Sequence, residues 1–315
     1  MVVEVKSVRR FAGSELHSTD RVMRHLQSGG VAVVDGEWPE VCRLYDWLYA
    51  RRDQLTRRGK ERMGGRQWEN ARLALLDNLV VDGVDGLRPV RHLRQSEAAL
   101  AQRHPVTALG GAELLADREV LAPRSQETLW LIRRAIEGCR ASLPTEPRVL
   151  DMGCGSGVCA LLAAQALGAK AQILATDHLP AAVATTRTNA ERLGVANITA
   201  VGPGDLYEPV AGERFDLIIF NAPWVVAPAH NPAETALNDA GQSTVARFLG
   251  AAAAHLNVGG RLILGYADHS GPAAIERLEA LIQRAGLVVE AKLSDRIRTH
   301  RHNRAWETVF AYVLR

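Results

Sequence analysis

Short apolar runs alternate with amphipathic stretches along the chain from about residue 148 onward. Buried parallel strands read as nearly continuous apolar runs, whereas helices repeat apolar residues every three or four positions. The alternation therefore predicts an α/β fold, Rossmann-like, with a doubly wound and mostly parallel sheet. The expected strands are 148–151, 172–176, 197–201, 215–220 and 261–265, and the expected helices are 158–167, 180–193 and 243–256.

Two further strand-like runs, 287–291 and 308–314, follow in the C-terminal tail. They predict an antiparallel hairpin at an edge of the sheet. The basic run 296–304 between them is expected to form the exposed loop of this hairpin, with contact to a phosphate or an acidic substrate as the functional alternative.

The first part of the chain is rich in arginine and has helical spacing. Residues 39–58 place apolar side chains at helical intervals with polar residues between them. We therefore expect a smaller, mainly helical domain over residues 1–110, with a substrate-recognition or accessory role. The larger α/β domain is expected over residues 111–315.

Composition limits the classes of protein that remain. The chain has 315 residues, 47% of them apolar, which suffices for the core of one large or two modest domains. A net charge of +3 gives no strong case for nucleic acid. The four cysteines show no metal-ligand spacing, so no metal is expected. No signal-peptide core or membrane-spanning run is present, which predicts a cytoplasmic protein without a membrane partner; the oligomeric state is not indicated.

A glycine-rich loop, Asp151-Met152-Gly153-Cys154-Gly155-Ser156-Gly157, follows the strand expected at 148–151. Gly153, Gly155 and Gly157 would let a ligand approach the backbone without a Cβ in the way. Their G-x-G-x-G spacing differs from the dinucleotide fingerprint G-x-G-x-x-G. Asp151 suits the ammonium of an amino-acid moiety and would repel a pyrophosphate at the helix N-terminus. Both features favour a ligand with an amino-acid moiety over a dinucleotide.

Two more carboxylates end the next expected strands. Asp177, roughly 20 residues beyond the glycine loop, is placed to accept hydrogen bonds from both ribose hydroxyls. Asp205 is placed to accept from an adenine amino group. Each alone could be a helix cap or a turn residue. Three carboxylates at successive strand ends around one glycine loop resemble the cofactor site of the class I S-adenosylmethionine (SAM) methyltransferases, and this resemblance implies SAM rather than a nicotinamide cofactor.

Asn221-Ala222-Pro223-Trp224 directly follows the apolar run 215–220. Ligands of open α/β sheets bind beyond the carboxyl ends of the strands. The tetrapeptide offers an amide carbonyl, a backbone restricted by proline and a flat aromatic ring. These groups together could hold a planar nitrogen group.

Four segments, in this order, resemble the class I SAM-dependent methyltransferases of the release factor glutamine methyltransferase (HemK/PrmC) family. The likeness covers roughly residues 105–290 and does not extend to the first hundred residues. Where the family has I-P-R-P-x-T-E, D-L-F-E-P, N-P-P-Y and D-G-G, this chain has L-A-P-R-S-Q-E-T at 121–128, D-L-Y-E-P at 205–209, N-A-P-W at 221–224 and N-D-A-G at 238–241.

The resemblance implies methyl transfer from SAM to an amide nitrogen without a metal. Asn221, Pro223 and Trp224 would be the catalytic residues, and Asn221 would also contact the cofactor. The Asn221 carbonyl and the backbone carbonyl of Ala222 would accept the two amide hydrogens, while Trp224 stacks on the flat substrate group.

Two departures from N-P-P-Y change what the acceptor is expected to be. Ala222 replaces a proline, and Trp224 replaces a tyrosine and enlarges the ring. We therefore expect either a small planar nitrogen compound of specialised metabolism or a protein glutamine, as in the family. Arg124 and His230 are added as substrate-binding candidates, Arg124 because it precedes a helix near the cofactor and His230 because it lies in a long segment after Trp224.

Three alternatives stay open. Base-amino methyltransferases of nucleic acids use the same Asn-Pro-aromatic arrangement on a flipped base, so nucleic acid is a less favoured partner. An O- or C-methyltransferase would need a base near the acceptor, for which His230 is the candidate. A catalytically inactive SAM-binding scaffold is the non-enzyme alternative.

Overall fold

The structure, a computed structural model, describes residues 8–12, 19–55, 65–83, 86–100, 102–123, 125–230, 232–301 and 304–315. The chain divides into two compact units, Met1–Ala98 and Ala99–Arg315. This division lies before the boundary expected at residue 110. The reason is that Val106, Ala108 and Leu109 are buried in the hydrophobic core of the second unit.

The N-terminal unit is built on a four-stranded sheet in the order β1-β2-β3-β4. The first three strands are parallel, and β4 runs antiparallel to β3. Its elements are β1 (Val8–Ala12), α1 (Thr19–Gln27), β2 (Val31–Asp35), α2 (Trp38–Ala50), η2 (Arg52–Gln54), α3 (Gly65–Leu76), β3 (Leu79–Gly83), β4 (Gly86–Pro89) and α4 (Val90–Leu100).

The mainly helical prediction did not include the four strands of this unit, which are present beside its helices. The strands were missed because each has only four or five residues, too few for a period of two to stand out from flanking helical spacing. The helix expected at 39–58 ends at Ala50 and is followed by the short η2. Side chains from β2, α1 and α2, among them Val34, Leu26 and Leu48, share one buried core.

The second unit contains a seven-stranded sheet in the order β12-β13-β11-β10-β7-β8-β9. All neighbouring pairs from β11 to β9 are parallel, and β13 is antiparallel to both of its neighbours. The predicted α/β fold with a C-terminal antiparallel hairpin is therefore confirmed. The seven strands of the sheet are β7 (Arg148–Met152), β8 (Gln172–Thr176), β9 (Ile198–Val201), β10 (Phe215–Asn221), β11 (Leu256–Ala267), β12 (Val289–Arg301) and β13 (Arg304–Leu314). The unit also contains β5 (His104–Val106) and β6 (Ala112–Leu114), which pair with each other.

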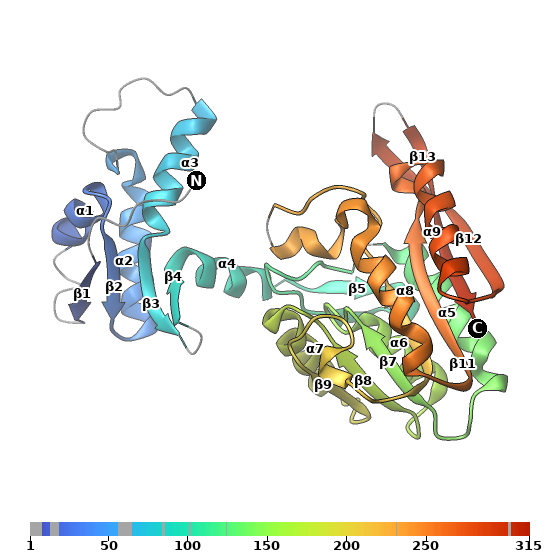
Figure 1. Cartoon of the computed structure of the whole chain (residues 1–315). Coiled ribbons are helices and arrows are strands. Elements are labelled where there is room, and N and C mark those ends of the chain that lie inside the picture. The colour runs from blue at the N-terminus through green and yellow to red at the C-terminus, as the bar shows by residue number, and fades with distance from the viewer. Residues whose placement is uncertain are drawn as a thin grey trace. The chain divides into compact units, whose positions relative to one another are not determined.

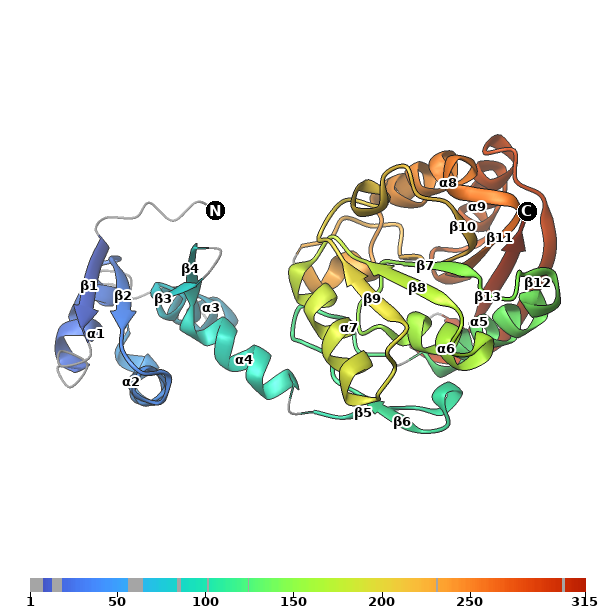
Figure 2. The same ribbon diagram turned by 90° about the horizontal axis from the view of Figure 1, so that it is seen from below.

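Helices cover both faces of this sheet (Figures 1 and 2). Buried side chains of α5 and α6 form one core with the strands, and those of α8 and α9 form another. The helices are α5 (Gln126–Cys139), α6 (Val158–Leu167), α7 (Pro180–Arg192), α8 (Ser243–His255) and α9 (Pro272–Arg284), with the short turns η3 (Thr107–Leu109), η4 (Arg140–Ser142), η5 (Glu208–Val210), η6 (Pro232–Ala236), η7 (Ala240–Gln242) and η8 (Asp268–Ser270).

The C-terminal hairpin is longer than expected. The run 296–304 was expected to be a loop, but β12 continues to Arg301 and β13 begins at Arg304. One face of this two-stranded ribbon is exposed to solvent and carries charged side chains. Charged residues are also typical of loops, so the sequence did not indicate strands here. Figure 1 shows the hairpin in red, running past the end of β11.

The order of the strands places the ligand site. The chain goes from β7 outward to β8 and β9 and then returns to β10, which pairs with the other side of β7. In open α/β sheets, ligands bind beyond the carboxyl ends of the strands at such a reversal. In the part of the chain that the structure describes, no helix combines the length and the apolar character needed to span a membrane.

Candidate functional site

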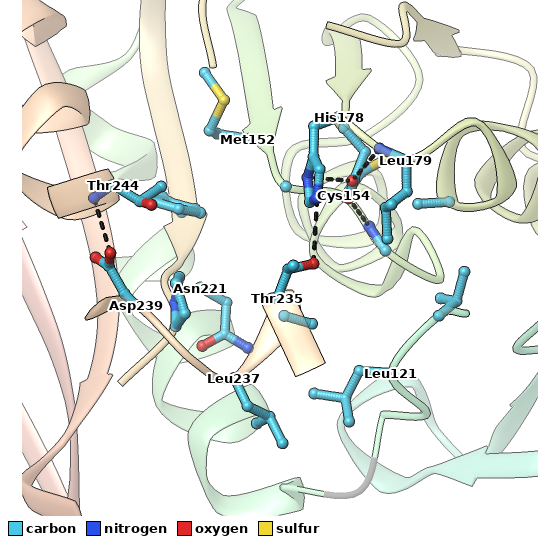
Figure 3. A pocket seen from close by; sticks show the side chains of 18 of the residues that line it. Leu121, Met152, Cys154, His178, Leu179, Asn221, Thr235, Leu237, Asp239 and Thr244 are labelled. Atoms are coloured by element: carbon cyan, nitrogen blue, oxygen red, sulfur yellow. Dashed lines mark hydrogen bonds and ion pairs between the residues drawn. The ribbon is translucent and has the colours of Figure 1, made fainter. Parts of the chain in front are cut away.

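A cavity of about 810 Å³ lies at the carboxyl ends of β7, β8 and β10. Its wall comes from the segment before α5, the glycine loop, the starts of α6 and α7, the loop after β9, the end of β10 and the segment leading into α8. Figure 3 shows His178 and Leu179 across the cavity from Asn221 and Asp239. The size is in the range of cofactor and small-molecule sites.

The glycine loop forms one wall of this cavity. Gly153 and Gly155 line it, as predicted, and both have positive φ angles, 64° and 54°, which favour glycine. Gly157 does not belong to the lining. A Cβ there would lie 3.2 Å from the Cα of Thr186 in α7, so this glycine allows close packing of the loop against that helix.

Asp151 is not on the cavity wall, and its contact with the cofactor ammonium stays a prediction. Its carboxylate is 1% exposed and accepts a hydrogen bond from the Ala160 N–H at 2.9 Å, near the start of α6. Burial raises the pKa of this carboxyl to about 8. Burial thus favours the neutral form of this carboxyl, whereas a positive charge beside it would favour the anion.

Asp177 lies on the wall where the prediction placed it. Its carboxylate accepts the N–H of Gly155 at 3.0 Å and the N–H of Leu179 at 2.9 Å, so it joins the glycine loop to the start of α7. His178 Nδ1 lies 3.2 Å from the same carboxylate, and this hydrogen bond raises the pKa of His178. Carboxylate oxygens have about four lone-pair sites in total, which leaves acceptor capacity for ribose hydroxyls.

Asp205 also lines the cavity, at the end of the loop that follows β9. Arg247 of α8 forms an ion pair with its carboxylate, with one nitrogen–oxygen distance of 3.2 Å. If Asp205 also accepts a hydrogen bond from an adenine amino group, as predicted, its carboxylate would bind that group and Arg247 at the same time.

Asn221 ends β10 and lines the cavity at the point where the strand order reverses. Its Oδ1 is buried and has no hydrogen-bond partner in the described parts of the chain. A Cβ on Gly265 of the neighbouring β11 would come within 2.7 Å of this oxygen. A buried amide oxygen without a donor is costly, so an N–H from a ligand would stabilise this side chain once it turned toward the cavity.

Pro223 and Trp224 line the cavity next to Asn221, but Ala222 does not. The Ala222 side chain is 1% exposed and packs in the core with α8, while its N–H donates to the carbonyl of Gly265. Any contact of Ala222 with a substrate would therefore have to come from its backbone carbonyl.

The segment after Trp224 is held on two sides. Val225 pairs with residues 237–239, donating to the Leu237 carbonyl and accepting from the Asp239 N–H, each at 2.8 Å. On the other side, Ser270 Oγ accepts the Val226 N–H at 2.8 Å and donates to the Trp224 carbonyl at 3.3 Å. Ser270 belongs to η8, directly after β11, and had not been predicted as a site residue.

The remaining predictions for the site have different outcomes. His230 is exposed and is not a lining residue, so the structure does not support it as an acid or base at the acceptor. Arg124 lies outside the described residues, although its neighbours Pro123 and Ser125 line the cavity.

The segment 235–240 supplies lining residues that the prediction missed, even though the motif at 238–241 had marked it. Asp239 accepts the N–H groups of Thr244 and Val245 at the start of α8, which fixes the segment at the cavity wall. His178, which directly follows Asp177 at a strand end, also lines the cavity.

Among the described side chains, no group of three or more His, Cys, Asp or Glu residues is arranged to hold a metal ion. The wall fits SAM in other respects: a glycine loop without Cβ atoms, the Asp177 carboxylate at the end of β8 and an apolar floor that includes Met152 and Phe220. Gly153, Gly155 and Asp177 are thus the residues that would hold SAM, which supplies an electrophilic methyl group on a sulfonium.

Comparisons with known proteins point to one family. Residues 140–292 match the family model described as methyltransferase small domain. The release factor glutamine methyltransferase of Xylella fastidiosa (strain Temecula1) is 34% identical over 193 residues, which cover 58% of this chain and 67% of that protein. The protein of the same name from Bordetella pertussis (strain Tohama I) is 35% identical over 197 residues, covering 57% and 68%.

Solved structures include more distant matches. The ribosomal protein L11 methylase from Lactobacillus delbrueckii subsp. bulgaricus is 21% identical, with a TM-score of 0.42, and the match covers 59% of this chain and 78% of that one.

Proposed function

The chain belongs to the release factor glutamine methyltransferase family and is a SAM-dependent methyltransferase, and we propose that it methylates the side-chain amide nitrogen of a glutamine in a protein. The curated relatives carry a name that states this acceptor. Membership of a methyltransferase family favours an enzyme over the inactive SAM-binding scaffold, which was the non-enzyme alternative. A cytoplasmic location remains a prediction.

One observation carries the proposal: Asn221, whose Oδ1 has no hydrogen-bond partner among the described residues, lines the cavity beside Pro223 and Trp224. An amide nitrogen is a weak nucleophile because its lone pair is delocalised. Two carbonyl acceptors for its hydrogens would fix the orientation of the nitrogen, and the Trp224 ring would pack on the flat amide group. Catalysis then consists mainly of positioning.

Asn221→Ala is the direct test. We expect turnover of methyl-labelled SAM to fall by about 100-fold, the loss typical of removing one fixed hydrogen-bonding group from an active site. Asn257→Ala is the matched control, because Asn257 binds Asp216 at the amino end of β11, on the opposite edge of the sheet. Binding of S-adenosylhomocysteine, measured by calorimetry, should be retained by both variants. Loss of that binding in Asn221→Ala would assign Asn221 to the cofactor instead.

The acceptor class can be identified in a cell extract. The purified chain is incubated with methyl-labelled SAM and extract, and the products are separated into protein, nucleic-acid and small-molecule fractions. We expect label in protein, at a glutamine after digestion and mass spectrometry. Label only in nucleic acid would overturn the proposal in favour of base-amino methylation.

A small planar nitrogen compound is the second candidate acceptor. It is favoured by the larger ring of Trp224 and by Leu121 and Leu237, which add apolar side chains to the wall. Label confined to the small-molecule fraction would select it over protein glutamine.

A further inference from the structure

The C-terminal hairpin extends beyond the sheet at the edge that holds the cavity. β13 pairs with β11 from Val309 to Leu314, and the register Ala267↔Val309 puts the preceding residues of β13 past the carboxyl end of β11. We call residues 295–301 of β12 and 304–308 of β13 the arm. Figure 1 shows it in red at the free end of the hairpin.

The arm has two different faces, because side chains alternate along a strand and directly paired residues share a face. The pairs Arg298↔Trp306 and Arg296↔Thr308 lie on one face, and Ile297↔Glu307 lies on the other. Ile297 packs against the core of the unit, and Glu307 is 6% exposed. The opposite face presents Arg296, Arg298 and Trp306 to solvent; we call it the outer face.

The inner face ties the arm to the acceptor segment. Glu307 lies 3.0 Å from Nδ1 of His269, and the next residue, Ser270, holds the backbone of Trp224 and Val226. The arm therefore stands beside the Asn221–Trp224 corner of the cavity, where a protein that inserts one side chain would lie against the enzyme.

The outer face is basic and aromatic. The Arg296 guanidinium lies 5.2 Å from the centre of the Trp306 ring, and Trp306 is 47% exposed. The arm contains four arginines and two acidic residues, Asp295 and Glu307, which lie on the same face as Ile297. Exposed tryptophan and arginine are the residue types most often responsible for binding energy at protein interfaces.

We propose that the outer face of the arm docks an acidic segment of the protein substrate whose glutamine enters the cavity. This inference rests on the proposed function and adds to it the chemistry of the partner surface. An acidic peptide fits better than RNA because the positive charge is local. Residues 99–315 contain 21 basic and 21 acidic residues, so this unit lacks the overall positive charge typical of nucleic-acid-binding domains.

Two labelled peptides test the proposal with the full chain. One carries a glutamine flanked by a run of aspartates, and the other replaces the aspartates with asparagines. We expect fluorescence anisotropy to show binding of the acidic peptide that weakens with added salt. The double variant Arg296→Glu/Arg298→Glu should weaken it about tenfold, which corresponds to about 1.4 kcal/mol. Trp306→Ala should weaken binding with the salt dependence retained.

The matched control is Arg140→Glu/Lys170→Glu, which reverses two exposed charges at the amino ends of β7 and β8, on the opposite edge of the sheet. This control should bind like the original chain. Equal binding of both peptides, an equal loss in the control, or absence of binding would overturn the proposal. Tighter binding of an oligouridine that depends on Arg296 and Arg298 would overturn it in favour of RNA.

The docking surface and the proposed function can fail separately. Arm-dependent binding without any methyl transfer to glutamine would refute the function and leave the docking surface. Methyl transfer that is equal for both peptides and unaffected by Arg296→Glu/Arg298→Glu would refute the docking surface and leave the function.

Discussion

Gly265 shows how one backbone position on β11 controls the acceptor residue on β10. Its carbonyl accepts the Ala222 N–H, and its Cα lies against the Asn221 amide. A Cβ there would meet Oδ1 of Asn221 at 2.7 Å and Cδ1 of Ile132 at 3.1 Å, both closer than ordinary contact. Only a residue without a side chain allows this arrangement.

Gly265→Ala should therefore displace the Asn221 amide. We expect turnover to fall by about tenfold or more, because a small misplacement of reacting groups has large effects on rate. Affinity for S-adenosylhomocysteine should change little. Gly250→Ala is the control: a Cβ at this position in α8 meets nothing within 4 Å, and alanine is the better helix former. Full activity of Gly265→Ala would mean that the Asn221 amide can reach its working position without the space at Gly265.

Asp151 leads to a prediction about stability and pH. The pKa of its carboxyl is raised to about 8 by burial, whereas an unfolded chain releases the proton near pH 4. Between these values the folded chain holds more protons than the unfolded one, so this group lowers the free energy of unfolding as the pH rises toward 8. Asp151→Asn keeps an oxygen for the Ala160 N–H and does not titrate.

We therefore expect Asp151→Asn to be more stable than the original chain at pH 8.5, with a smaller difference at pH 5.5. Urea unfolding at both pH values, without cofactor, measures this. An original chain that gains stability relative to the variant as the pH rises would contradict the prediction and show that the carboxylate is held as an anion.

The sequence predicted the cavity-lining residues at or after strand ends. It predicted the placement of Asp151, which lies inside a strand, less well. Asp177, Asn221 and Trp224 come at or after the ends of β8 and β10, and ends of parallel strands share one edge. Asp151 is the fourth residue of β7, where side chains alternate between faces. The face toward which the Asp151 side chain points depends on the residue at which β7 ends. The glycine spacing does not define the end of the strand to within one residue.

At the scale of elements, η8 connects the end of β11 to the acceptor segment. Ser270 Oγ bonds to the Trp224 carbonyl and the Val226 N–H, so it restrains the backbone on both sides of Val225. We interpret Ser270 as a positioning residue. Nothing in the sequence around it indicated this, because the contact joins residues far apart in the chain.

Ser270→Ala should reduce the methylation rate about fivefold, as each of the two hydrogen bonds contributes roughly 1 kcal/mol or less. Ser270→Thr keeps the hydroxyl at an exposed position and should restore the rate. Steady-state kinetics with the peptide acceptor separate this from a stability defect. If the threonine variant is as slow as the alanine variant, the hydroxyl is not the group that matters.

In the second unit, the hydrophobic pattern predicted which segments are helices and which are strands, but it did not predict the lengths of the hairpin strands. Helices 158–167 and 243–255 end within a residue of prediction, because apolar burial against a sheet makes their periodicity clear. The hairpin strands were predicted too short, since their outer halves have solvent on one face and carry arginine there. The same exposure that hid these strands makes the arm available to a partner.

At the scale of the whole molecule, the cavity belongs to one unit. All residues that line it fall between Glu119 and Arg247, within the unit Ala99–Arg315. The N-terminal unit has its own sheet and its own core, which includes Phe11, Leu26 and Leu76. Each unit therefore contains what a domain needs to fold alone. The net charge of +3 is also that of residues 1–98, since the second unit is neutral.

Residues 99–315, produced alone, should bind S-adenosylhomocysteine within about threefold of the affinity of the full chain, because the cofactor wall is complete in that unit. Calorimetry on both proteins measures this. Methylation of a protein acceptor should fall in the shortened chain while methylation of a short glutamine peptide persists, if the N-terminal unit recognises the protein substrate. Equal loss with both acceptors would place part of the catalytic requirement in residues 1–98. Equal activity with both would make that unit accessory, and the arm would then be the principal candidate for contact with the protein.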